Sequence, residues 1–249
     1  MTRPGGVVLA AGAAAAAVMV VTGWPIETDQ PAPSSPSSAA PSSPSSAGRP
    51  TSSSSSSAAA GTSRAREQLE QLPVKGRAPK TGYDRDRFGQ RWSDDVDVAG
   101  GHNGCDTRND VLARDLRQVR VKPDTNGCVV LTGVLRDPYS GQTHPFERGP
   151  DSDEIPVDHV VALANAWQTG AQQLTAQERQ DLANDPDNLQ TTTQALNAQK
   201  SDGDAATWLP PSTSYRCTYA ARQIAVKARY QLWVTPPEKD ALNNVLDRC

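Results

Sequence analysis

The residues best suited to chemistry are an aspartate and a histidine that stand side by side in an apolar stretch. Asp158 and His159 lie in the segment IPVDHVVAL, residues 155–163. Imidazole is the side chain whose ordinary pKa lies nearest to neutrality, so His159 is suited to act as a general base. Side chains alternate between the two faces of a strand, so both residues can serve one site only if the strand bends or ends there. By itself, an Asp-His dipeptide in a strand is more often an exposed pair than a catalytic site.

Three further polar residues follow this pair along the chain. Asn188 begins an extended segment, and Asn197 and Lys200 lie one turn apart on the same face of a predicted helix. Each residue also has a purely structural interpretation. Asn188 could cap the turn that follows Pro186, and Asn197 and Lys200 could be ordinary solvated helix residues.

In this order of residues the chain resembles the HNH, or ββα-metal, nucleases, in a variant with Asp-His, Asn and Asn at the motif positions. It is similar to an exported actinobacterial-type branch related to the nuclease domain of GmrSD-type modification-dependent restriction enzymes. The resemblance covers residues 83–249 and is carried by YDRDRFGQRW (83–92), GCDTRNDVL (104–112), DPYSG (137–141), VDHVVALANAW (157–167), NDPDNL (184–189), NAQKSDGDAATWLPP (197–211) and YRCTYAARQIAVKARYQLWVTPPE (215–238).

The resemblance implies a role for each of the five residues. His159 would be the general base that takes a proton from the attacking water, and Asn188 would orient it through a hydrogen bond. Asp158 and Asn197 would hold one divalent cation, and their oxygen ligands suit Mg²⁺ or Mn²⁺ better than zinc. Lys200 would contact a phosphate of the substrate.

The elements that must position these residues follow from hydrophobic spacing and turn residues. The fold class predicted is α+β, a ββα-metal core with short antiparallel strands and surrounding helices. The residues Thr175 and Glu178, and likewise Thr235 and Glu238, are spaced as capping boxes at helix starts. The expected elements are helices at 107–119, 162–170, 175–184, 215–231 and 236–248, a helix carrying Asn197 and Lys200, a β-hairpin within 128–149, a buried strand at 155–161 and an extended piece at 188–192.

The first quarter of the chain has the composition of an export segment and a linker. Residues 1–29 contain Arg3 followed by an uncharged apolar stretch, which indicates a signal peptide or an N-terminal membrane anchor. Residues 30–63 contain 15 Ser, 7 Ala and 6 Pro, so they lack the apolar side chains needed for a core and are predicted to be a disordered linker. Residues 64–249 remain for one folded domain, secreted or held at the cell surface.

The four cysteines, Cys105, Cys128, Cys217 and Cys249, suit an exported domain. An even number of cysteines outside the cytoplasm favours two disulfides over a metal site. Three pairings are possible, and we favour the local ones, Cys105–Cys128 and Cys217–Cys249.

The net charge argues against tight binding of nucleic acid. Residues 64–249 carry 23 Lys and Arg against 26 Asp and Glu, whereas nucleic-acid-binding domains usually have a basic footprint. Two local groups of basic residues could still contact phosphates, the alternating charges at 84–91 and the set Arg222, Lys227 and Arg229. Binding is expected to be weak, sensitive to salt and indifferent to base sequence.

Three hypotheses for function follow. The first is a metal-dependent endonuclease that hydrolyses phosphodiester bonds, in DNA rather than RNA, with low sequence specificity. The second is a non-catalytic extracellular binding module on an HNH scaffold. The third is a cell-wall hydrolase, but the sequence contains neither a zinc ligand set nor a convincing paired-carboxylate motif for that activity. Nothing in the sequence indicates an obligate protein partner.

Overall fold

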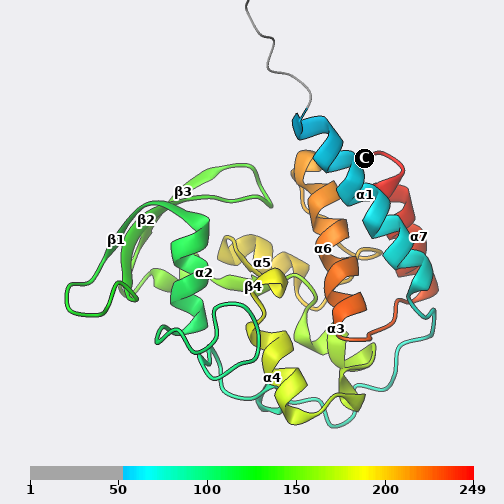
Figure 1. Cartoon of the computed structure of the whole chain (residues 1–249), viewed down its shortest axis with the longest axis horizontal. Coiled ribbons are helices and arrows are strands. Elements are labelled where there is room, and N and C mark those ends of the chain that lie inside the picture. The colour runs from blue at the N-terminus through cyan, green and yellow to red at the C-terminus, as the bar shows by residue number, and fades with distance from the viewer. Residues whose placement is uncertain (1–52) are drawn as a thin grey trace, which may run out of the picture. The chain divides into compact units, whose positions relative to one another are not determined.

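The computed structural model describes residues 53–249, with side chains from residue 60 onward (Figure 1). The expected export segment and residues 30–52 of the expected linker lie outside this range. Within the described range, no helix is long and apolar enough to cross a membrane. The structure is α+β, as predicted, with small antiparallel sheets, seven α-helices in the described part, and two disulfides.

Helix α1 (Ser53–Gln71) begins inside the segment that composition predicts to be a linker. Residues 53–63 are thus helical where we expected no secondary structure. The later turns of α1 bury Ala65 and Leu69 in a core with Ile224 and Leu242, which lie on α6 (Arg216–Arg229) and α7 (Pro236–Leu246). Most helical stability comes from packing of an apolar face, so this tertiary contact explains a helix that Ser-rich composition does not predict.

A three-stranded antiparallel sheet follows helix α2 (Thr107–Asp115), and its strands are β1 (Leu116–Val121), β2 (Val130–Arg136) and β3 (Thr143–Glu147) in the order β1-β2-β3. The hairpin of β2 and β3 confirms the prediction. The helix predicted over 107–119 was wrong in its last four residues, because Leu116 leaves the helix to pair with Leu135 of β2. The apolar residues at 116 and 119 fit a strand as well as a helix, and only the partner strand distinguishes the two.

A second, two-stranded sheet lies between the first sheet and the helices α1, α6 and α7 (Figure 1). Its strands β4 (Val157–His159) and β5 (Leu189–Thr191) are antiparallel, with Asp158 opposite Gln190. Helix α5 (Gln194–Lys200) follows β5 and carries Asn197 and Lys200. Asp158 and His159 lie on β4, and Asn188 directly precedes β5. The chain between β4 and β5 forms α3 (Leu163–Gln168) and α4 (Ala176–Asn184).

Local sequence signals at the helix ends are confirmed. Both predicted capping boxes form, with the Thr175 and Thr235 hydroxyls accepting from the backbone N–H of Glu178 and Glu238. Both favoured disulfides are also present, Cys105–Cys128 and Cys217–Cys249. The second disulfide links the first turn of α6 to the last residue of the chain.

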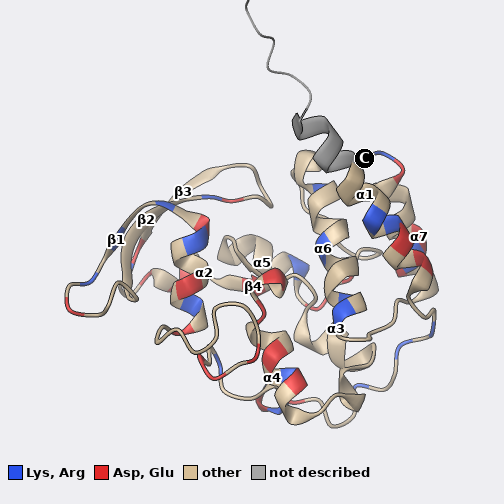
Figure 2. Ribbon diagram, viewed as in Figure 1, with Lys and Arg blue, Asp and Glu red and all other residues tan. Residues whose placement is uncertain are grey.

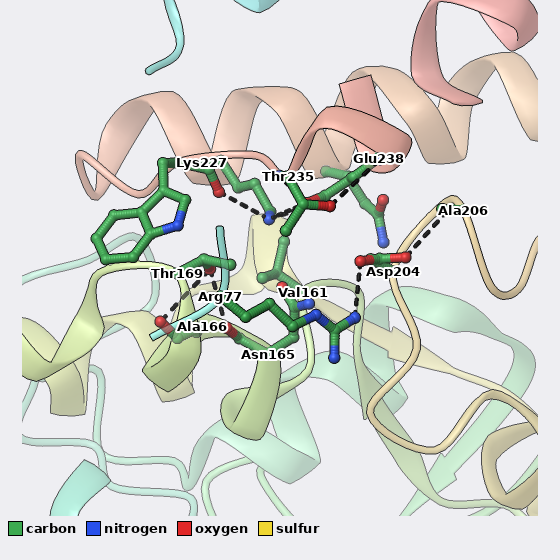
Figure 3. Close-up of polar contacts among 12 residues, drawn as sticks. Arg77, Val161, Asn165, Ala166, Thr169, Asp204, Ala206, Lys227, Thr235 and Glu238 are labelled. Carbon is green, nitrogen blue, oxygen red and sulfur yellow. Dashed lines mark hydrogen bonds and ion pairs between the residues drawn. The ribbon is translucent and has the colours of Figure 1, made fainter. Parts of the chain in front are cut away.

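A buried ion pair joins α6 to α7 (Figure 3). Lys227 Nζ lies 2.8 Å from Glu238 Oε2, and both side chains are inaccessible to solvent. A second pair lies nearby, where Arg77 of the segment after α1 donates to the buried carboxylate of Asp204, 2.7 Å away. The first pair ties α6 to α7, and the second ties the segment after α1 to the loop after α5.

Candidate active site

The strand β4 ends at His159, and this end brings Asp158 and His159 to one pocket. The backbone N–H of Val160 donates to the carbonyl of Asn188, 2.7 Å away, and the chain then turns toward α3. Asp158, His159 and Asn197 line the same pocket of about 290 Å³. The strand end therefore meets the condition for two neighbouring side chains to serve one site.

The His159 imidazole is buried and held by two contacts. Its Nε2 lies 2.9 Å from the carbonyl oxygen of Ala183, and its ring stacks on that of Trp92 with centroids 6.2 Å apart. A carbonyl oxygen can only accept, so Nε2 carries the hydrogen and Nδ1 of the neutral ring is left as an acceptor. Burial, with the positive charge of Arg85 as the next cause, lowers the pKa of His159 to about 3, so the ring is neutral at physiological pH.

Asp158 is buried between two hydrogen-bond donors. Its Oδ2 accepts from the Tyr139 hydroxyl at 2.8 Å, and its Oδ1 accepts from Lys200 Nζ at 3.0 Å. Burial raises the pKa of this carboxyl, and the charge of Lys200 opposes the rise. A carboxylate has about four lone-pair positions, so these two bonds leave acceptor capacity for a further ligand.

Lys200 does not lie where we predicted. Its side chain is inaccessible to solvent, and Nζ donates to Asp158 and to the carbonyl oxygen of His159, 2.7 Å away. The lysine therefore holds the two residues of β4 in place instead of reaching into solvent toward a phosphate. A buried ammonium needs such partners, which explains the difference.

Asn188 forms different hydrogen bonds from the one we predicted. Its Oδ1 accepts from the backbone N–H of Val161 at 2.8 Å, and its Nδ2 donates to the carbonyl of Leu182 at 3.1 Å. The partner of the imidazole is the carbonyl of Ala183, the residue after Leu182. Asn188 thus connects the end of β4 to the segment that orients His159, and it does so through backbone groups.

Replacing Asn188 by alanine is expected to lower the free energy of unfolding by about 1–3 kcal/mol, because the buried Val161 N–H would lose its acceptor. Urea denaturation measures this change. Asn197→Ala is the matched control, and it is expected to change stability by less than about 0.5 kcal/mol. Equal stabilities of the two variants would contradict the anchoring role of Asn188.

Asn197 lies on α5 and is half-buried at the pocket. In the part of the chain that the structure describes, its side-chain amide has no hydrogen-bond partner. Residues 53–249 contain no group of three or more His, Cys, Asp and Glu side chains arranged to hold a metal. A cation here would accordingly need the amide oxygen of Asn197 and water beside the Asp158 carboxylate, a donor set typical of Mg²⁺. The roles of His159, Asp158 and Asn197 stay predictions.

Several residues of this site were not predicted, although they lie in segments that carry the family resemblance. Trp92 stacks on His159 from a backbone with φ of 59°. Tyr139, in the hairpin turn, donates to Asp158. Arg85 lines the pocket. A positive φ is strained for a bulky residue such as Trp92, and strained residues cluster at functional sites.

One of the two basic groups that could contact phosphates is already occupied by protein partners. Arg229 pairs with Asp185 and Asp187 at 2.6 and 2.8 Å, and Lys227 is buried against Glu238. Arg222 donates to carbonyl oxygens of the loop before β5, including that of Leu189. The suggestion that these three residues form a phosphate-binding face was therefore wrong.

The chain matches a known family over this region. Residues 106–245 match the family described as GmrSD restriction endonucleases, C-terminal domain. This chain belongs to that family. The matched range includes all five predicted site residues. Arg85 and Trp92 precede residue 106, so they lie outside the matched range although they line the pockets at the site. The assignment to an actinobacterial-type branch of the family stays a prediction.

A similar protein is an uncharacterized secreted protein of Arthroderma benhamiae. It is 38% identical over 189 residues, which make up 75% of this chain and 85% of that protein. No solved structure was found to match the chain.

Proposed function

We propose that this chain is an exported, metal-dependent endonuclease that hydrolyses phosphodiester bonds, in DNA rather than RNA. The observation that carries the proposal is the pocket at the end of β4, where an oriented neutral imidazole and two oxygen donors meet in a chain of a restriction-endonuclease family. Its two disulfides and its similarity to a secreted protein support export.

His159 would act as the general base. Nδ1 would take a proton from the attacking water, and the Nε2 hydrogen bond to the carbonyl of Ala183 would stabilise the imidazolium that forms. The stacked ring of Trp92 would restrict rotation of the imidazole and so help to keep Nδ1 in the orientation that the reaction needs.

Asp158 and Asn197 would hold one divalent cation, Mg²⁺ or Mn²⁺ rather than zinc, with water completing its coordination. When bound, the cation would supply Lewis-acid stabilisation of charge on the phosphoryl oxygen and the leaving group. Lys200 and Tyr139 donate to the other acceptor positions of Asp158 and so keep its carboxylate in one orientation. Tight binding of nucleic acid is not expected, because acidic and basic residues are interspersed on elements such as α2 and α4 (Figure 2).

Removal of divalent cations is expected to lower cleavage of supercoiled plasmid DNA by at least roughly a hundred-fold, which corresponds to about 2.7 kcal/mol of transition-state stabilisation. Nicked and linear products are measured on gels with Mg²⁺ or Mn²⁺, with chelator, and after the metal is added back. Undiminished cleavage in chelator contradicts the metal role. A folded protein that binds no divalent cation and cleaves nothing supports the non-catalytic binding module instead.

A further inference from the structure

Two pockets flank the His159 imidazole and share a wall. The larger one contains Asp158 and Asn197, and a smaller one of about 70 Å³ lies on the side of Trp92. Arg85, His159 and Leu163 line both pockets, whereas Arg91 lines only the smaller one. Both arginines thus line the smaller pocket, and Arg85 also lines the larger one.

Arg85 and Arg91 differ from most of the other basic residues around the site. Both are exposed, and within residues 53–249 neither forms an ion pair or a hydrogen bond through its side chain. Arg114, Arg222 and Arg229, by contrast, all donate to protein oxygens. Burial is the main cause that lowers the pKa of His159, and the charges of Arg85 and Arg91 add to it; burial and then the charge of Arg91 likewise lower the pKa of Arg85. Two like charges without protein partners at one pocket rim form a place where an anion would be stabilised.

The segment that carries the two arginines is held rigidly. Arg85 begins a single 3-10 turn, Arg85–Phe88, whose N-terminus is capped by Asp84. Phe88 is buried in the core with Leu163, and Arg179 of α4 donates to the carbonyl of Arg87 at 2.7 Å. A fixed backbone means that little ordering is needed when the arginines bind a ligand.

We propose that Arg85 and Arg91 bind two phosphates of the nucleic-acid backbone, one on each side of His159. Arg85 would contact the phosphate that is cleaved, in the larger pocket, and Arg91 would contact its neighbour at the smaller pocket. A guanidinium presents paired N–H groups that match phosphate oxygens, and contacts to phosphates carry no base specificity. The inference rests on the proposed function and assigns its phosphate contacts to these arginines instead of Lys200.

Binding without cleavage tests the assignment. A fluorescently labelled DNA duplex is titrated, at several salt concentrations, with protein carrying His159→Ala alone or with Arg85→Gln or Arg91→Gln added. Each lost phosphate contact is expected to reduce the slope of log affinity against log salt by about 0.9. Arg87→Gln is the matched control, because Arg87 lies on the same 3-10 turn and lines neither pocket. Arg85→Lys keeps the charge and is expected to restore the slope.

Cleavage kinetics separate the two arginines and the two proposals. With His159 intact, Arg91→Gln is expected to raise KM with little change in kcat, whereas Arg85→Gln lowers kcat as well, because its phosphate is the one that reacts. If the protein with His159 intact cleaves DNA but the salt slopes of Arg85→Gln and Arg91→Gln equal that of Arg87→Gln, the phosphate assignment is overturned and the proposed function is not. A parent that does not cleave overturns the proposed function, while reduced slopes in that protein still support the two phosphate contacts.

Discussion

His159→Ala is expected to lower the rate of DNA cleavage by roughly a hundred- to ten-thousand-fold, the usual contribution of a general base. Among residues 60–249, His159 is the only histidine that lines either pocket, so no other imidazole can act as the base there. Its Nε2 is hydrogen-bonded to the carbonyl oxygen of Ala183, which leaves Nδ1 to accept the proton. The rate is measured on plasmid DNA at saturating Mg²⁺, with the affinity for DNA measured in parallel.

His102→Ala is the matched control for this experiment. His102 is exposed and lines neither pocket, and its ring nitrogens lie 3.8 Å from the exposed carboxylates of Asp95 and Asp97. We expect its loss to leave the cleavage rate unchanged. Unaltered cleavage by a folded His159→Ala protein would falsify the general-base role, and a His102→Ala protein with the same loss would indicate a general effect on stability.

Lys227→Met is expected to lower the free energy of unfolding by about 3–5 kcal/mol, because it leaves the carboxylate of Glu238 buried without its cation. Burial lowers the pKa of Lys227 and raises that of Glu238, so both groups depend on one another to remain charged. Figure 3 shows how the lysine reaches from α6 toward Glu238 on α7. Denaturation with urea, followed by circular dichroism, measures the change.

Two further variants identify the cause of the loss. The double variant Lys227→Met with Glu238→Leu is expected to recover most of the stability, because no charge is then left buried. Lys239→Met breaks an ion pair with Glu70, whose side chain is 66% exposed, and is expected to cost less than about 1 kcal/mol. A Lys227→Met protein as stable as Lys239→Met would show that the buried pair contributes nothing to the fold.

The elements of the site were predictable where their signals are local. The spacing of Thr175 and Glu178 indicates a helix start, and the helix begins there because the bonds involved join residues three positions apart. The strand predicted at 155–161 and the helix with Asn197 follow in the same way from patterns within a few residues, although the observed strand is shorter and ends at His159. Strand β1 could not be found by this reasoning, because Leu116 joins it by pairing with a residue on another strand.

The ion-pair partners of the charged residues could not be predicted from the sequence, for a related reason. Lys200 and Arg85 are both basic residues beside conspicuous motifs, yet one is inaccessible inside an ion pair with Asp158 and the other lies at the rim of the pocket without a protein partner. Which cation neutralises a buried carboxylate depends on contacts between segments far apart in the chain. Those contacts cannot be predicted from the local sequence around either residue.

The sequence by itself determined the α+β class and the Asp158-His159 pair with Asn197 downstream, and it favoured one of three pairings of the four cysteines, which the structure confirms. Only the tertiary structure decided that Lys200 supports Asp158, that Ala183 and Trp92 hold the imidazole, and that Arg85 and Arg91 line the pockets beside it. The division has one physical reason. Turns, caps and strand ends are set by hydrogen bonds between near neighbours, whereas burial and charge pairing are set by whichever distant side chains the folded chain brings together.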